Sequence, residues 1–178
     1  GFADIKDKTI RSVGKAYDRF NEDALRMIRA ARFAVELGFI IEKDTFKAIQ
    51  SLHSTIKDVS IERIRDEFTK IILSPNPKAG VELLHETGLL KNFIPELEKG
   101  IGVDQNQAHA FTVWEHLLRS LQHAADKGWD LEIRLSALFH DIAKPQTKGL
   151  SRETGQPTFY GHEVVGSRET RKILERMK

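Results

Sequence analysis

The sequence predicts an all-α protein, and two observations carry that prediction. Apolar residues recur at helical spacing along most of the chain, as at Ile61, Ile64, Phe68 and Ile71, whose 3-4-3 spacing gives one helix a continuous apolar face. Strand signals are poor, since residues 9–13 are the only candidate. The chain is therefore expected to bury its apolar residues between packed helices.

Proline and glycine set the boundaries of the first of these helices. Pro75 and Pro77 should stop the helix that carries the 3-4-3 pattern, because proline cannot donate a backbone hydrogen bond. The next helix has Leu84 on its inner face, and Gly88 is suited to the residue just after its end.

Capping residues predict the helices of the second half. Thr112 and Glu115 have the spacing of a capping box ahead of an apolar helix, which Gly128 should end. Asp130 can then cap a helix over residues 131–144. Two residues mark the remaining boundaries: Pro145, which should close that helix, and His162, near which a last helix begins.

Composition bounds the class of protein. The 178 residues are 40% hydrophobic and 30% charged, enough for one large or two small domains with a real core. No run approaches the roughly 18 apolar residues of a membrane span. Cysteine is absent, and the net charge is only +2. We expect a cytoplasmic protein without a membrane partner, with a boundary near Gly100 that separates residues 1–100 from residues 101–178.

One motif in the first half can read a nucleobase. Asp23 and Arg26 are three residues apart, so on one helix face they present an acceptor beside a fork of donors. Cytosine and adenine both show an amino donor beside a ring-nitrogen acceptor, which matches this pair. Guanine and uracil show the reverse order, which would leave buried polar groups unpaired. The bland alternative is that Asn21 caps a helix and that Glu22 and Asp23 complement its dipole.

The surrounding sequence, FNEDALRMIRAARFAVELGFIIEKDTFKAI and then SIERIRDEFTKIILSPNPKAGVELLHETGLL, resembles the bacterial-type tRNA nucleotidyltransferases and poly(A) polymerases. This family includes CCA-adding, CC-adding and A-adding enzymes. The resemblance implies a helical neck that selects nucleotides and binds RNA, in which Asp23 and Arg26 template incoming CTP or ATP and Glu22 and Arg29 support them. It offers Arg32 as a weaker candidate for a triphosphate or RNA contact, against the alternative of a solvated surface arginine.

The resemblance also implies that this chain is a fragment. The family's catalytic head carries a Gly-Gly motif and a carboxylate pair that holds two Mg²⁺ ions, and neither pattern occurs here. The start at Gly1 resembles the segment just after that head. We therefore expect neck and body without the head, no catalytic residue for nucleotide transfer, and tRNA with CTP or ATP as partners of the parent enzyme.

A second constellation lies in residues 101–178. His140 and Asp141 are adjacent at a helix end, and His116 on a neighbouring helix can add a ligand to the same divalent metal. The pattern resembles the HD phosphohydrolase superfamily, which implies His116, His140 and Asp141 as metal ligands. By the same resemblance His162 serves a second metal or a phosphate, and Lys144 meets a phosphate oxygen. His109 is a weaker extra candidate.

The HD resemblance is incomplete in one respect. The family pattern ends with a distal Asp, for which this chain offers no position, so we expect a truncated HD domain. The alternative is that the histidines are buried structural residues and Asp141 is a helix-end cap. Three functions remain open: the selecting part of a tRNA nucleotidyltransferase, an HD-type phosphohydrolase acting on nucleotides, and a non-catalytic RNA-binding module. The sequence leaves open which bases are added, the metal and the oligomeric state.

Overall fold

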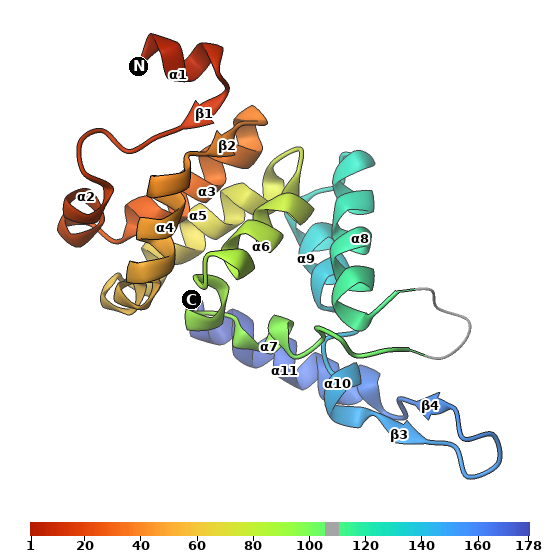
Figure 1. Cartoon of the computed structure of the whole chain (residues 1–178). Helices are drawn as coiled ribbons and strands as arrows, with labels where there is room; N and C mark the ends of the chain where they lie inside the picture. The colour runs from red at the N-terminus through yellow and green to blue at the C-terminus, as the bar shows by residue number, and fades with distance from the viewer. Residues whose placement is uncertain (106–110) are drawn as a thin grey trace. The chain divides into compact units, whose positions relative to one another are not determined.

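The computed structural model describes residues 1–105 and 111–178, and it divides into two compact units, Gly1–Phe93 and Ile94–Lys178 (Figure 1). The described residues are mainly helical and their strands are only two residues long, which confirms the all-α prediction. The candidate His109 lies outside the described residues. No described helix is long and apolar enough to cross a membrane.

The first unit is built around one central helix. Its elements are α1 (Phe2–Lys6), β1 (Thr9–Ile10), α2 (Ala16–Glu22), α3 (Leu25–Leu37), β2 (Ile40–Ile41), α4 (Lys43–Leu52), the 3₁₀ helix η1 (His53–Asp58), α5 (Ile61–Leu73), α6 (Pro77–Glu86) and the 3₁₀ helix η2 (Leu90–Asn92). Helix α3 packs against both α5 and α6. Its fully buried residues include Met27, Ile28 and Ala31. The expected apolar face of α5 is also buried at Ile64 and Phe68.

A short strand pair fixes the entry of the chain into this unit. Strand β1 pairs in parallel with β2, with Thr9 opposite Ile40 and Ile10 opposite Ile41. The strand candidate at residues 9–13 is thus confirmed for its first two residues. Strand β2 gave no sequence signal, because two residues are too few to show the alternation that identifies a strand.

The helix carrying the Asp23 motif is broken where the sequence suggested that it begins. Asn21 lies inside α2 and is therefore not the expected N-cap. Asp23 lies beyond the end of α2 with an extended backbone, and α3 starts at Leu25. The break is stabilised locally, because the Asp23 carboxylate accepts the backbone N–H of Leu25 at 3.1 Å. Only Arg26 of the motif pair therefore stands in a helical first turn.

The second unit holds two helix pairs. Its elements are α7 (Pro95–Glu98), α8 (Val113–Asp126), α9 (Leu131–Phe139), α10 (Lys144–Thr147), β3 (Gly149–Leu150), β4 (Pro157–Thr158) and α11 (His162–Arg176). Helix α8 packs on α9, and α10 packs on α11. The predicted capping box is confirmed: Thr112 Oγ1 accepts the N–H of Glu115 at 3.3 Å, and the Glu115 carboxylate accepts the N–H of Thr112 at 2.9 Å.

The helix expected over residues 131–144 is shorter than predicted. Asp130 does cap it, since its side chain accepts the N–H of Ile133 at 3.2 Å. The helix ends at Phe139, and a turn follows in which the N–H of Lys144 donates to the carbonyl of Asp141 at 3.0 Å. Pro145 then lies in the first turn of α10, where its missing N–H costs nothing.

Candidate functional site

Both carboxylate oxygens of Asp23 are engaged at the break between α2 and α3. Oδ1 accepts the N–H of Leu25, and Oδ2 accepts Nη2 of Arg63 at 3.1 Å. Arg63 belongs to α5, so a helix distant in sequence helps to fix the direction of the carboxylate. The Asp23 side chain is 27% exposed. A ligand can therefore approach it, in competition with Arg63.

Arg26 is oriented by α2. Its Nη1 donates to Oε2 of Glu22 at 2.8 Å and to the backbone carbonyl of Arg19 at 3.0 Å. The hydrogen bond from Arg26 is the main reason why the pKa of Glu22 lies below its ordinary value. Glu22 also pairs with the side chain of Arg19. Glu22 is thus the acid that links the two arginines.

Two hollows flank this motif. The first, of about 260 Å³, is lined by four arginines, Arg11, Arg19, Arg26 and Arg29, with no acidic residue in its lining. Such a hollow suits an anion. Among the residues that the structure describes, the guanidinium of Arg29 has no acidic partner; it lies 5.9 Å from the ring centroid of Phe33.

The second hollow, of about 480 Å³, is lined by Glu22, Asp23, Asp58, Ser60 and Arg63, among others. Asp23 and Arg26 therefore line different hollows, between which Phe20 contributes to both walls. The structure places the two residues at one helix break but does not align them as one recognition edge. Their role in selecting a base stays a prediction, as do the supporting roles of Glu22 and Arg29.

Arg32 is neither solvated nor directed into the arginine-lined hollow. Its Nε lies 2.6 Å from Oε2 of Glu67, and its Nη1 lies 2.7 Å from Oε2 of Glu36. The guanidinium also stacks 4.0 Å from the ring centroid of Phe33. With its side chain only 12% exposed, Arg32 is a packed ion-pair residue that joins α3 to α5.

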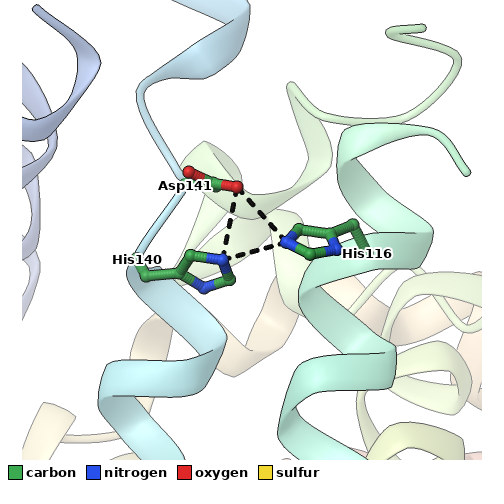
Figure 2. Close-up of side chains that lie close together, drawn as sticks. All are labelled: His116, His140 and Asp141. Carbon is green, nitrogen blue, oxygen red and sulfur yellow. Dashed lines mark hydrogen bonds and ion pairs between the residues drawn. The ribbon is translucent and has the colours of Figure 1, made fainter. Parts of the chain in front are cut away.

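In the second unit, His116, His140 and Asp141 point toward one another (Figure 2). The two Nε2 atoms are 3.0 Å apart, and Oδ2 of Asp141 lies 3.3 Å from Nε2 of His116 and 3.2 Å from Nε2 of His140. Helix α8 supplies His116, while the early end of α9 exposes His140 and turns Asp141 inward. The break in the predicted helix is thus what brings the three groups together.

The spacing of these three atoms fits one metal ion. Two ligand atoms bound at about 2.1 Å lie about 3.0 Å apart at a right angle and about 3.4 Å apart at the tetrahedral angle. The three observed separations fall within that range. Imidazole nitrogens together with a carboxylate oxygen are common ligands of zinc and of other first-row transition metals. The group can therefore hold a divalent metal with little rearrangement, and no other described His, Cys, Asp and Glu residues form such a group.

Backbone hydrogen bonds orient two of the imidazoles. Nδ1 of His140 lies 2.9 Å from the carbonyl oxygen of Ala137, so as a donor it leaves Nε2 free to serve as a ligand. His162 is held in the same way, with Nδ1 2.7 Å from the carbonyl of Phe159. Its Nε2, however, approaches the other oxygen of Asp141, Oδ1, at 3.3 Å. His162 therefore belongs to the cluster without belonging to the triangle of three ligand atoms.

Lys144 completes the charge balance around Asp141. Its Nζ lies 2.7 Å from Oδ2 of Asp141 and donates to Oε1 of Gln105 at 2.7 Å. Burial alone would raise the pKa of Asp141, but hydrogen bonds from His140 and Lys144 outweigh burial and hold that pKa well below its usual range. The same hydrogen bond to Asp141 raises the pKa of His140.

Sequence reasoning missed two partners at these sites. Arg63 lies 40 residues from Asp23, and no local pattern connects them. The sequence predicted that Lys144 contacts a phosphate oxygen, but in the structure its ammonium group forms an ion pair with Asp141. Asp141 and Lys144 are three positions apart across the start of a helix, and this spacing was the signal that could have suggested their contact.

Comparison with known proteins agrees with both halves of this description. Residues 38–101 match the family model described as "Probable RNA and SrmB- binding site of polymerase A", and residues 113–178 match the HD domain. The second match contains His116, His140, Asp141 and His162.

The relatives of this chain include two tRNA nucleotidyltransferases and a multifunctional CCA protein. The A-adding tRNA nucleotidyltransferase of Deinococcus radiodurans is 35% identical over all of this chain and 42% of its own length. The CC-adding tRNA nucleotidyltransferase of Thermus thermophilus is 35% identical over 86% of this chain and 37% of its own. The multifunctional CCA protein of Neisseria meningitidis serogroup A is 32% identical over all of this chain and 42% of its own. The chain thus spans less than half the length of these relatives.

Solved structures share the fold. A tRNA-processing enzyme in its apo form aligns with a TM-score of 0.63 at 20% identity, over 99% of this chain and 41% of that one. A tRNA nucleotidyltransferase complexed with a primer tRNA and an incoming ATP analogue aligns with a TM-score of 0.60 at 23% identity, over 98% of this chain and 48% of that one. These likenesses show the fold alone. The relatives and the two family models show that the chain belongs to the tRNA nucleotidyltransferase family, as a segment in which a match to an RNA-binding model is followed by an HD domain.

Proposed function

We propose that this chain is the nucleotide-selecting and RNA-binding part of an enzyme that adds C, A or both to tRNA 3′ ends from CTP and ATP. The observation that carries the proposal is the helix break at Asp23 and Arg26, which keeps an acceptor and a donor fork at one turn, with Arg26 in the wall of the arginine-lined hollow and Asp23 in the wall of the second hollow. The arginines would hold phosphate groups while Asp23 and Arg26 read the base. The transfer chemistry, with its Mg²⁺, belongs to the catalytic head of the parent enzyme.

The mechanism that this assignment implies is selection by hydrogen-bond matching. A cytosine or adenine that donates its amino group to Asp23 would replace Arg63 at Oδ2, while Oδ1 keeps the backbone of Leu25 in place. Arg26 would turn from the Glu22 carboxylate toward the ring nitrogen. Guanine and uracil would set an acceptor against the Asp23 carboxylate or a donor against the Arg26 guanidinium. Each buried group left unpaired in this way costs about 1–3 kcal/mol.

The test uses the parent enzyme that carries this chain, tRNA without its 3′ terminus, Mg²⁺ and each nucleoside triphosphate in turn. Wild-type protein should incorporate C or A and reject G and U. Asp23→Ala and Arg26→Ala should each reduce that discrimination roughly tenfold or more. Asp66→Ala is a matched control, because Asp66 is an exposed acid on α5 that pairs with its neighbour Arg65. Unchanged selectivity in both motif variants would refute the templating role.

The ligand triangle in the second unit favours a second activity, metal-dependent hydrolysis of phosphate esters of nucleotides. His116, His140 and Asp141 would hold a divalent metal, which when bound polarises phosphoryl oxygens and activates water. His162 lies in the same cluster and would contact the phosphate. His140→Ala should abolish metal-dependent hydrolysis, whereas Asp23→Ala should leave it unchanged. Hydrolysis that survives His140→Ala would assign it elsewhere.

The match of residues 38–101 supports RNA binding by the first unit. If the chain serves only as an RNA-binding module, it should bind tRNA in a salt-sensitive manner and turn over no substrate. Arg29→Ala should then weaken tRNA binding. Tight tRNA binding that is indifferent to salt would argue against phosphate contacts by these arginines.

A further inference from the structure

A lysine shares the carboxylate oxygen that completes the ligand triangle. Oδ2 of Asp141 is the oxygen approached by both His116 and His140, and Nζ of Lys144 lies only 2.7 Å from it. Lys144 is itself buried, at 9% exposure. Its ammonium is fixed on the other side by Oε1 of Gln105 at 2.7 Å. Lys144 is therefore fixed within the cluster by partners on two sides.

The chemistry of a buried carboxylate explains why a cation stands there. Asp141 is 6% exposed, and a buried negative charge is costly unless it is paired. Without a metal, Lys144 supplies the positive charge. A divalent ion bonded to Oδ2 would stand within a few ångströms of the ammonium group, and the two cations would repel one another. Metal and lysine therefore compete for one oxygen.

We infer that Lys144 is an internal counter-cation of Asp141 that a metal ion must displace, so that this lysine lowers the metal affinity of the site and stabilises it when no metal is bound. Lys144 acts through Asp141 and is a positioning residue. The inference rests on the proposed metal site, and it assigns to Lys144 a role other than phosphate binding. It follows from the convergence of three groups on Oδ2, while Oδ1 is left to His162.

The first experiment is a titration of the metal-free chain with Co²⁺, followed by visible absorption and by calorimetry. Lys144→Met should bind Co²⁺ roughly tenfold or more tightly than wild type, a change typical of groups that adjust a metal ligand. Lys148→Met is the matched control, because it removes the same charge from an exposed position four residues along. It should bind like wild type, and Asp141→Asn should lose the absorption bands.

A second measurement separates competition from a merely structural role. Without metal, Lys144→Met should unfold at a lower temperature than wild type, because it removes the ammonium group that pairs with the buried carboxylate of Asp141. Saturating Co²⁺ should remove that difference, since the metal then supplies the charge. If the variant does not fold, the wild-type chain still gives an answer. Its Lys144 should react faster with acetic anhydride, measured by peptide mass spectrometry, once Co²⁺ has displaced it.

The outcomes distinguish the inference from the proposal on which it rests. Weaker or equal Co²⁺ binding by Lys144→Met, with wild-type binding intact, overturns the inference and leaves the metal site standing. Labelling of Lys144 that does not change with Co²⁺ overturns it as well. Absence of Co²⁺ binding in wild type and in Lys144→Met overturns the metal site and the inference together.

Discussion

Arg32 on α3 and Glu67 on α5 form a buried ion pair, with 2.6 Å between Nε and Oε2 and side chains only 12% and 9% exposed. The family resemblance of the sequence made Arg32 a weaker candidate for a contact with a triphosphate or with RNA. In the structure Arg32 instead packs inside the first unit, where it joins α3 to α5. Three arginines in a row at helical spacing, Arg26, Arg29 and Arg32, thus have three different surroundings.

Replacing Arg32 should destabilise the protein. Arg32→Ala leaves Glu67 with Lys70 as its remaining cation, at 3.0 Å, and we expect a loss of about 3 kcal/mol in the free energy of unfolding. Denaturant unfolding measures it. Arg65→Ala is the control, because the Arg65 side chain is 40% exposed and pairs with its exposed sequence neighbour Asp66, so its loss should stay within about 0.5 kcal/mol. Equal losses in the two variants would contradict the buried-pair assignment.

The same pair predicts a dependence of stability on pH. Burial would raise the pKa of Glu67, but hydrogen bonds from Lys70 and Arg32 outweigh burial and lower that pKa below its ordinary 4.5. A lowered pKa in the folded state means that Glu67 stabilises the fold fully above about pH 5 and loses this effect as the pH falls through the folded value. Wild type should therefore lose more stability than Glu67→Gln between about pH 5 and pH 3. Parallel curves for the two proteins would remove Glu67 from the acid transition.

Two glycines in helices should respond to alanine with opposite signs. At Gly80 in α6 an added Cβ would lie 2.3 Å from Cγ2 of the fully buried Ile71, so Gly80→Ala should cost about 1–3 kcal/mol. At Gly166 in α11 the nearest atom is Cβ of Ala143 at 3.7 Å, an ordinary contact. Gly166→Ala should therefore gain up to about 1 kcal/mol from helix propensity. Thermal unfolding of the two variants compares them directly, and a stabilising Gly80→Ala would show that the α5–α6 contact is loose.

The C-terminal helix should depend on the shape of an arginine rather than on its charge alone. Nη1 and Nη2 of Arg176 donate to Oε1 and Oε2 of Glu96 at 2.9 and 2.8 Å, a two-pronged pair that lysine cannot form. Arg176→Lys should lower the free energy of unfolding of the second unit by about 1 kcal/mol, since the arginine is 42% exposed. Arg171→Lys on the same helix is the control and should have no effect. A harmless Arg176→Lys would reduce the pair to a simple charge contact.

What the sequence could predict was local. The capping box of Thr112 and Glu115 and the apolar face of α5 are encoded within a few residues, and both are confirmed. The end of α9 at Phe139 escaped prediction, because residues 131–144 contain no glycine or proline and their pattern predicts one continuous helix. The side chains of the turn that follows contact a residue from another helix, His116 of α8, which the local pattern cannot reveal.

The same limit applies to the nucleotide motif. The residues at Asp23 and Arg26 were identified from their spacing, yet their surroundings depend on α2 and on Arg63 of α5. Long-range partners decide which donors and acceptors are already engaged. The residue types and their spacing therefore indicate which hydrogen-bonding groups a motif supplies. The fold determines which existing partners of those groups a ligand must displace.

The divided carboxylate of Asp23 makes this position open to redesign. One oxygen accepts the backbone N–H of Leu25, and the other accepts Nη2 of Arg63. Asparagine at position 23 would retain an oxygen for the N–H of Leu25 and present an amide donor where the second oxygen stands. In the proposed templating role, the hydrogen-bonding polarity of this side chain can thus be inverted while the turn that supports it is conserved, so that base preference and folding can be varied separately.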